Sequence, residues 1–424
     1  MYSLRGKIMK QLIIVGNGLD LTAELPTRYD DFFAWLKAWI GEINYSITRG
    51  NSAIYSESTV SDKFAENFDF WTGWFLTIYK RKFMDEPVEW NDVENQIEKV
   101  LRGLFVYNES TTYESLLRYA NLKVNMHKGD WREAFTHTLN YYFLDWLYYL
   151  NSNGSIEDSN KKLDLYKLLL EDLHKFETKF ATYLCEEVMN EERVSAFIGN
   201  NRNELYTRNI LLGNIVNRNS PYTIEDTKII NFNYTPIVSK SGDTSEELEK
   251  HVQYIHGSLG LDNSLNYTPC KTECVYSSII FGIDDTSLMS KDNEEQLRSK
   301  LFKFGKTYRI MNSLDNISLD INKEIKIVKF YGHSLNSADY AYFQSIFDTV
   351  NLYESDVKLY FYYGDFENEK NERMSMFMDR IYKLIETYGR NIFENSSEAR
   401  GKNLLHKLIL EGRIKTIYVP KYEV

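Results

Sequence analysis

Short runs of apolar residues, and longer segments with apolar residues at every third or fourth position, predict two kinds of element along this chain. Residues 11–15 read QLIIV and stop at a glycine, a pattern typical of a buried parallel strand. From about residue 27 to 217 no segment has a convincing strand pattern, and helices are predicted at residues 29–40, 70–83, 93–105, 138–150 and 165–188. Thr27 follows Pro26 and precedes Asp30 by three residues, so the first of these helices is expected to start at Thr27.

From residue 228 onward strand patterns return and alternate with helical ones. Strands are predicted at residues 228–235, 252–257, 278–284, 325–334, 357–365 and 414–420, and helices at residues 293–312, 338–352, 368–387 and 403–410. This alternation implies an α/β fold, with a Rossmann-like, doubly wound and mostly parallel sheet that includes the first strand. We expect residues 1–26 and 221–424 to form this nucleotide-binding domain and residues 27–220 to form a large α-helical insertion.

The composition limits the classes of function. A net charge of −11 argues against binding of DNA or RNA through the overall charge of the protein, although a local basic patch is still compatible with it. The apolar runs are too short to span a membrane, no signal peptide is expected, and three cysteines suit a reducing cytoplasm. Cys270 and Cys274 form a C-x3-C pair without a second pair to complete a zinc site, so two ordinary thiols and no metal are expected.

Polar residues stand at the carboxyl ends of the predicted strands, where doubly wound sheets bind their ligands. The five segments are Gly16-Asn17-Gly18, Asn231-Phe232-Asn233-Tyr234-Thr235, His256-Gly257-Ser258, Gly282-Ile283-Asp284-Asp285 and Gly332-His333-Ser334-Leu335. Their common position at strand ends predicts that they converge on one crevice.

The first of these segments is a candidate phosphate-binding turn. Gly16 and Gly18 would let the backbone approach a phosphate, whose charge the start of the following helix would favour; the alternative is a tight turn without a ligand. Leu21 occupies the place of the third glycine of a dehydrogenase fingerprint, and no ribose-binding acid appears near residues 36–40. Hydride transfer is therefore disfavoured.

Asn233 and His256 are the candidate catalytic residues. An imidazole at a strand end beside a glycine suits a general base near neutral pH, and the amide of Asn233 would orient water or a ribose hydroxyl. The alternative for His256 is a hydrogen-bonded histidine in a loop. Asn231 sits deeper in its strand and is expected to form a structural hydrogen bond.

The segment that begins at Gly332 is a second candidate ligand contact. Ser334 or the amides after Gly332 would hold a phosphate, while Asp339 would accept from ribose hydroxyls or favour the start of its helix. A hydrolase triad of Ser334, His333 and Asp339 is disfavoured, because adjacent side chains point apart on an extended chain. The full set of expected nucleotide contacts is Gly16, Asn17, Gly18, Asp20, Thr235, Gly332, His333, Ser334 and Asp339.

Taken in order, these motifs resemble the AbiH family of bacterial abortive-infection proteins. The matching stretches are IIVGNGLDLTAELPTRYDDF, VEWNDVE, NFNYT, YIHGSL, IIFGIDD and FYGHSLNSADYAYF. They run from about Ile13 to Phe343 in the order of the family. The resemblance implies a cytoplasmic effector of phage defence.

The same residues are more distantly similar to sirtuin-like NAD-binding domains. Asn233 corresponds to the asparagine of a T-x-N-x-D segment, and His256 to a histidine before glycine. Gly332 and Ser334 correspond to a late G-x-S-L segment, whereas Thr235 stands where those domains carry Asp. The zinc-binding cysteine quartet is missing, which argues against deacylation of protein lysines.

These resemblances imply hydrolysis of NAD or a related nucleotide at the N-glycosidic bond, with NAD as the substrate and no obligatory cofactor. The partners expected are a phage-derived trigger and further copies of the chain; a membrane is not expected, and nucleic acid is disfavoured without being excluded. Two alternatives stay open. One is a metal-dependent nuclease with ligands from Asp92, Glu94, Asp284 and Asp285, although Asp92 and Glu94 also suit the start of a helix. The other is a non-catalytic sensor that binds a nucleotide.

Overall fold

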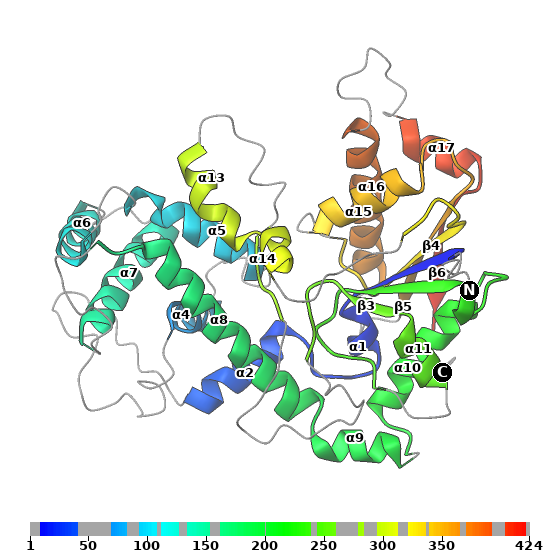
Figure 1. Ribbon diagram of the computed structural model, residues 1–424, viewed down its shortest axis with the longest axis horizontal. Helices are drawn as coiled ribbons and strands as arrows, with labels where there is room; N and C mark the ends of the chain where they lie inside the picture. Colours follow the sequence, from blue (N-terminus) through cyan, green and yellow to red (C-terminus); the bar gives the residue numbers. More distant parts are fainter. Residues whose placement is uncertain are drawn as a thin grey trace, which may run out of the picture. The chain divides into compact units, whose positions relative to one another are not determined.

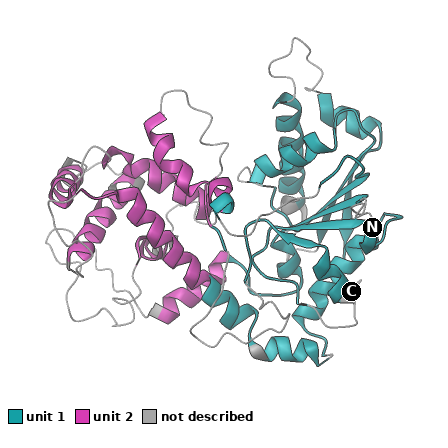
Figure 2. Ribbon diagram, viewed as in Figure 1, with its two compact units in different colours: residues 1–28, 181–280, 310–424 teal, residues 29–180, 281–309 magenta. Residues whose placement is uncertain are grey.

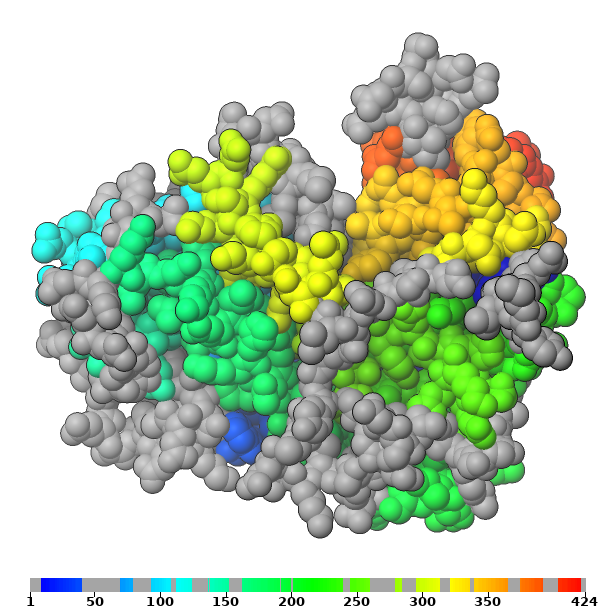
Figure 3. All heavy atoms as spheres, viewed as in Figure 1, coloured from blue at the N-terminus to red at the C-terminus, as the bar shows by residue number. Residues whose placement is uncertain are grey.

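The structure, a computed structural model, divides into two compact units, each formed by separate stretches of chain (Figure 2). Unit 1 holds residues 1–28, 181–280 and 310–424, and unit 2 holds residues 29–180 and 281–309. The residues that the structure describes, which Figure 3 shows in colour, are 9–40, 69–82, 93–107, 112–126, 134–152, 162–199, 201–238, 244–259, 279–283, 295–312, 321–335, 339–364, 370–391 and 403–420. Compared with the division expected from sequence, residues 181–220 group with the sheet and residues 281–309 with the helices.

Unit 1 is built around a six-stranded parallel sheet in the order β3-β2-β1-β4-β5-β6 (Figure 1). The strands are β1 (Gln11–Val15), β2 (Thr227–Asn231), β3 (Val252–Tyr254), β4 (Ile327–Tyr331), β5 (Lys358–Gly364) and β6 (Ile414–Val419). The strand order reverses between β1 and β4, so the last residue of β1, Val15, lies beside both Asn231 and Tyr331. An α/β fold with a doubly wound parallel sheet is therefore confirmed, and its switch point lies between β1 and β4.

Helices cover both faces of this sheet. They are α1 (Gly18–Thr22), α10 (Glu204–Asn217), α11 (Thr244–Lys250), α15 (Tyr340–Thr349), α16 (Lys370–Asn391) and α17 (Leu404–Leu410), and α9 (Glu191–Ile198) contacts α10. Alternate β1 side chains point to opposite faces: Leu12 and Ile14 pack with residues of α15, α16 and α17, while Ile13 and Val15 pack with residues of α10. Because both faces are covered, every residue of β1 is buried, as its uninterrupted apolar run predicts.

Unit 2 is helical over the residues described. Its helices are α2 (Tyr29–Ile40), α4 (Phe70–Lys82), α5 (Val93–Leu104), α6 (Tyr113–Met126), α7 (Ala134–Ser152) and α13 (Glu295–Leu301), and α8 (Leu165–Tyr183) and α14 (Lys306–Asn312) continue across its boundaries. Aromatic rings fill the interior: Phe70 makes edge contacts with Trp71 and Trp146, and Phe75 stacks on Phe176. The predicted helical character of this region is confirmed.

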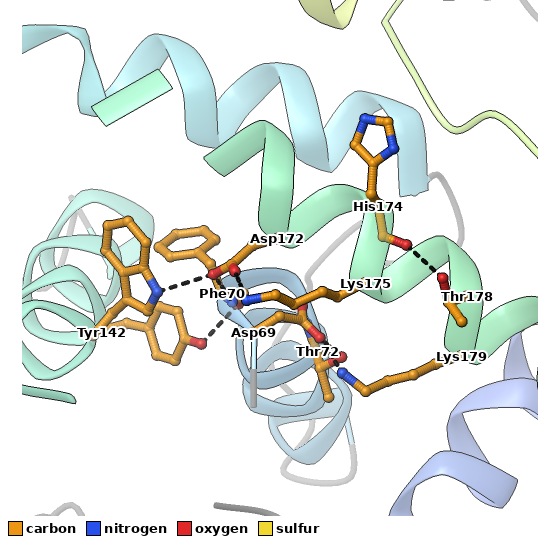
Figure 4. Close-up of polar contacts among 10 residues, drawn as sticks. Asp69, Phe70, Thr72, Tyr142, Asp172, His174, Lys175, Thr178 and Lys179 are labelled. Carbon is orange, nitrogen blue, oxygen red and sulfur yellow. Dashed lines mark hydrogen bonds and ion pairs between the residues drawn. The ribbon is translucent and has the colours of Figure 1, made fainter. Parts of the chain in front are cut away.

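A buried polar network ties three helices of unit 2 together (Figure 4). Asp69, just before α4, forms an ion pair with Lys179 of α8. Asp172 of α8 accepts hydrogen bonds from the amide of Phe70 at 2.8 Å and from the indole of Trp146 in α7 at 3.1 Å. Burial raises the pKa of Asp172, and the nearby Asp69 carboxylate adds to the effect.

One predicted strand, at residues 278–284, is wrong over the part that the structure describes. Residues 279–282 have no strand geometry, and Ile283 forms only an isolated bridge with Gly305. The amide of Phe281 donates to Glu177 at 2.7 Å, and its carbonyl accepts from Arg309. Charged side chains therefore satisfy the backbone groups that a strand partner would otherwise satisfy.

Two helix boundaries also differ from the sequence-based expectation. The first predicted helix begins at Tyr29, because the hydroxyl of Thr27 donates to Asn17 instead of capping the helix. The segment expected as one helix at residues 293–312 is interrupted by a 3-10 turn at Phe302–Phe304, between α13 and α14.

Lys329 is a buried cation in the centre of the sheet. It lies in β4 with no exposed surface, and its Nζ donates to the carbonyls of Ile215 at 2.8 Å and Val216 at 2.9 Å. These carbonyls lie in the last turn of α10, so the side chain joins the helix end to the sheet. Burial lowers the pKa of Lys329 to about 7, and a neutral amine still has two N–H groups, one for each carbonyl.

Replacement of Lys329 by methionine is expected to remove a pH dependence of stability. In the wild type the unfolded lysine keeps its proton up to its ordinary pKa of 10.5, whereas the folded one releases it near pH 7. The unfolded state therefore binds more protons in this window, and the free energy of unfolding rises as pH rises from about 7 to 9.5. Urea unfolding across this range would show the rise in the wild type and a smaller slope in Lys329→Met; equal slopes would contradict the assignment.

Candidate functional site

The ends of β1 and β4 meet in a close backbone contact. The amide of Gly16 donates to the carbonyl of Tyr331 at 3.1 Å, and the amide of Gly18 donates to the carbonyl of Gly332 at 2.8 Å. A Cβ atom at Gly18 would lie 2.5 Å from the Cα of Gly332, and one at Gly16 would lie 2.7 Å from the Cα of His333. Gly332 itself has a φ of +68°, a conformation that favours glycine.

This contact explains the glycines of the first turn without a ligand. The amides of Gly16 and Gly18 are used within the fold, so a phosphate at this turn would have to replace those hydrogen bonds. The side chain of Asn17 is also engaged: its Nδ2 donates to the carbonyl of Thr27 at 2.8 Å, and its Oδ1 accepts from the Thr27 hydroxyl at 2.6 Å. The turn therefore has a structural role, because it connects the end of β1 to the end of β4.

Asp20 and Thr235, two of the expected nucleotide contacts, belong to a buried ionic network. The hydroxyl of Thr235 donates to one oxygen of Asp20, and the other oxygen lies 3.5 Å from Nη1 of Arg208. Arg208 also donates to the carbonyl of Pro236 at 2.7 Å and has no exposed surface. Burial raises the pKa of Asp20, and the Arg208 guanidinium opposes this change. The network ties α1 and α10 to the loop after β2.

His256, which follows β3, comes together with His333 and Asp339, which both follow β4. Nε2 of His256 lies 3.4 Å from Oδ1 of Asp339, and Nε2 of His333 lies 3.3 Å from Oδ2 of the same carboxylate. Both imidazoles are buried, while the Asp339 side chain is 13% exposed. One carboxylate thus lies within ion-pair distance of two imidazoles.

The two histidines have different roles in this arrangement. Nδ1 of His333 accepts the backbone amide of Leu335 at 2.9 Å, so its proton in the neutral form is on Nε2, the nitrogen facing Asp339. Both nitrogens of His333 are therefore engaged, and it holds Asp339 in place. For His256, a proton on Nε2 directed at Asp339 would leave Nδ1 as its basic nitrogen.

Aromatic rings enclose these imidazoles. The ring of Phe232 makes edge contacts with His256 at 5.3 Å and with His333 at 4.6 Å between centroids. Tyr342 approaches His256 at 5.8 Å. The apolar surroundings strengthen the electrostatic contact between each imidazole and Asp339.

Asn233 lies at the same sheet edge as His256. The β2–β3 pairing of Asn231 with Tyr254 continues through two hydrogen bonds, from Ile255 to the Asn231 carbonyl at 3.1 Å and from Leu259 to the Tyr234 carbonyl at 3.0 Å. Asn233 and His256 both fall between these bonds. Asn233 is 4% exposed, and among the described residues neither polar atom of its side chain has a hydrogen-bond partner.

Asn231 does form a structural hydrogen bond: its Oδ1 accepts the backbone amide of Asn233 at 2.9 Å. This bond turns the chain at the end of β2 and helps to place Asn233 at the sheet edge. We call Asn233, His256, His333 and Asp339 the strand-end cluster.

The remaining sequence candidates lie elsewhere or outside the described residues. Ser334 is exposed, and its carbonyl accepts from Arg380 at 3.2 Å. Glu94 forms an ion pair with Lys306 at 2.7 Å inside unit 2. Five residues lie outside the described ranges: Asp92, Cys270, Cys274, Asp284 and Asp285. Within those ranges, no group of three or more His, Cys, Asp or Glu side chains is placed to hold a metal ion.

Sequence reasoning missed Arg208, Phe232 and Tyr342. Arg208 sits in α10, whose sequence gives no local sign of an interior charge, and its partner Asp20 is far away in sequence. Phe232 had a usable signal, because it stands between Asn231 and Asn233 in a strand end already singled out.

The fold and the strand-end cluster define an α/β protein with a candidate ligand site at the carboxyl edge of a doubly wound sheet. The chain belongs to the AbiH family: the family model described as "Bacteriophage abortive infection AbiH" matches residues 12–363, most of the 424-residue chain. This membership gives the protein a role in abortive infection by bacteriophage. No curated protein and no solved structure matches the chain significantly. None of the helices described is long and apolar enough to cross a membrane.

The glycine contact predicts a large effect from adding one methyl group. Gly18→Ala would place Cβ 2.5 Å from backbone that cannot move without distorting β4, and the expected loss in unfolding free energy is about 1–3 kcal/mol or more. Gly213→Ala in α10 is a matched control, since nothing lies within 4 Å of its Cβ position. Alanine there is expected to leave stability unchanged or raise it by up to about 1 kcal/mol. Equal stability of the two variants in urea would show that the turn is not tightly packed.

Proposed function

We propose that this chain hydrolyses NAD or a related nucleotide at the N-glycosidic bond, and that loss of this nucleotide is how it aborts infection. The observation that carries the proposal is the buried amide of Asn233, whose two polar atoms have no hydrogen-bond partner among the described residues. An unpaired buried amide costs about 1–3 kcal/mol, and a ligand that pairs with it accounts for its presence. Its place at the carboxyl edge of the sheet is where a nucleotide binds in folds of this class.

The proposed reaction requires few catalytic groups from the protein. As the C1′–N bond breaks, its electron pair passes to the pyridinium nitrogen, so nicotinamide leaves as a neutral molecule and needs no acid. The ribose passes through an oxocarbenium-like state, water forms the new C1′–O bond, and one proton must be accepted. The protein therefore has to orient the substrate, stabilise the developing cation and provide one base.

The strand-end cluster offers a group for each task. His256 would accept the proton of the attacking water, with Asp339 fixing its tautomer and stabilising the imidazolium that forms. Asn233 would orient the water or a ribose hydroxyl through its amide. His333 holds the second oxygen of Asp339 and so supports the base indirectly.

The distant similarity to sirtuin-like NAD-binding domains supports the same choice of substrate by analogy. Where those domains carry Asp, this chain has Thr235, whose hydroxyl is committed to Asp20. The first turn is also committed to internal contacts at Gly16 and Gly18. We therefore expect the substrate to be recognised mainly by the side chains of Asn233, His256 and the exposed Ser334, and less by the backbone of the first turn.

Release of nicotinamide from NAD tests the proposal. We expect turnover by the purified wild-type protein, or by protein activated in phage-infected cells. His256→Ala should lower kcat by at least about a hundredfold, as loss of a general base does. Asn233→Ala should lower it by about a hundredfold, as loss of one oriented polar group does.

His406→Ala, a change of an exposed histidine on α17, is the matched control and should keep wild-type turnover. An inert wild type under both conditions would overturn the proposal, as would His256→Ala with unchanged activity. Chelator-sensitive cleavage of DNA or RNA would replace it with the nuclease alternative, and tight NAD binding without turnover would replace it with a sensor.

Asp339 is expected to act as a positioning residue. In Asp339→Asn the amide cannot accept from both imidazoles with two equivalent oxygens, so kcat should fall by about ten- to a hundredfold while KM changes by less than about threefold. Asp339→Glu should recover part of the loss. If Asp339 instead held a ribose hydroxyl of the substrate, the main effect of Asp339→Asn would be a rise in KM, and this result would contradict the positioning role.

A further inference from the structure

Four peptide bonds join unit 2 to unit 1. They follow Arg28, Phe180, Ile280 and Arg309, because unit 2 consists of residues 29–180 and 281–309. The terminal residues of unit 2 at these crossings are therefore Tyr29, Phe180, Phe281 and Arg309. They are far apart in sequence.

Within unit 2 these four terminal residues gather in one place. The rings of Tyr29, Phe180 and Phe281 contact one another, with centroid separations of 5.9, 6.1 and 5.2 Å. Arg309 donates to the carbonyl of Phe281 and forms a two-pronged ion pair with Glu177, whose Oε2 lies 2.7 Å from Nη2. Glu177 also accepts the amide of Phe281 at 2.7 Å. We call these five residues the junction cluster.

The junction cluster is buried and charged. Phe281 has no exposed surface, and Glu177 and Arg309 are each less than a tenth exposed. A buried ion pair of this kind contributes little net stability while intact, but removal of one partner leaves an uncompensated charge and is strongly destabilising. The cluster therefore has one well-defined arrangement, and departure from it is costly.

On the unit 1 side, the same chain crossings lead directly to the candidate site. Ile280 is the last residue before the third crossing, and its amide donates to the carbonyl of His256 at 3.0 Å. Two residues before the first crossing, Thr27 makes both hydrogen bonds to the side chain of Asn17. Beyond the second crossing, the hydroxyl of Tyr183 donates to the carbonyl of Pro26.

We propose that the junction cluster is a rigid mechanical link through which events in the helical unit change the geometry of His256 and of the Gly16–Gly18 turn. Ile280 and Phe281 are consecutive: the first is bonded to His256 within unit 1, and the second is held by Glu177 and Arg309 within unit 2. Movement of Phe281 is passed through one peptide bond to the hydrogen bond on His256. As regulation of nucleotide hydrolysis this inference rests on the proposed function, whereas the mechanical coupling does not.

Amide hydrogen exchange on the full chain tests the coupling without any activity. Glu177→Gln removes the charge partner of Arg309. We expect exchange to become at least about tenfold faster in residues 279–283 and, through Ile280, in residues 252–259.

Asp172→Asn is the matched control. Asp172 lies on the same helix, α8, and is as buried as Glu177, but its contacts run to Phe70 and Trp146 in the unit 2 interior. This variant should speed exchange in α4 and α7 and leave residues 252–259 as in the wild type. Unchanged exchange at residues 252–259 in Glu177→Gln, or equal acceleration there in both variants, would overturn the proposal.

Turnover of NAD by the same variants separates this inference from the proposed function. With an active wild type, Glu177→Gln should change turnover by at least about threefold, and Asp172→Asn should not. If Glu177→Gln turns over NAD at the wild-type rate, regulation through the junction is excluded. If every protein is inert towards NAD, the proposed function fails, and the exchange pattern alone still decides whether the junction is coupled to His256.

Discussion

The close approach of Gly18 to Gly332 is the constraint on which the arrangement of the candidate site depends. β1 and β4 are neighbours in the sheet, and their parallel pairing continues beyond Val15 and Tyr331 into two turns that touch backbone to backbone. No side chain fits between these turns. The contact therefore fixes where α1 begins after one turn and where His333 projects from the other. Since His333 holds Asp339, the position of the carboxylate that faces His256 follows in part from a contact that contains no functional group.

Buried charges mark the places where loops, rather than helices or strands, must be held. Arg208 with Asp20 secures the loop after β2 by donating to the carbonyl of Pro236. Arg309 with Glu177 secures the irregular backbone at Phe281 in the same way. Desolvation makes such pairs poor contributors to stability, and their evident effect here is to give irregular backbone one defined conformation. Both pairs lie next to segments on which the proposals depend, the end of β2 in one case and the chain crossing in the other.

The sequence predicted the sheet well because its central strands are buried on both faces. The residues LIIV of β1 form an uninterrupted apolar run, and β4 is apolar apart from Lys329, which is a local signal. The failure at residues 278–284 has a definite cause: the run there is just as apolar, but the hydrogen-bond partners of Phe281 are side chains from helices distant in sequence. For the candidate site, polar residues at strand ends were visible locally. The sharing of Asp339 between two histidines, and the unpaired amide of Asn233, depend on tertiary contacts that no local pattern encodes.

The internal contacts of the first turn change the interpretation of its Gly-Asn-Gly sequence. A Gly-Asn-Gly turn after a buried strand is typical of phosphate binding, yet here the glycine amides and the Asn17 side chain are all engaged within the protein. The groups left for recognition lie instead at the ends of β2, β3 and β4, and they are the amide of Asn233, the imidazole of His256 and the hydroxyl of the exposed Ser334 rather than backbone N–H groups. Such a set is poorly suited to hold a diphosphate and better suited to hold a ribose and a water molecule, because its members both donate and accept hydrogen bonds. If a dinucleotide binds here, its affinity would come mainly from the glycosidic end, which is also where the proposed bond breaks.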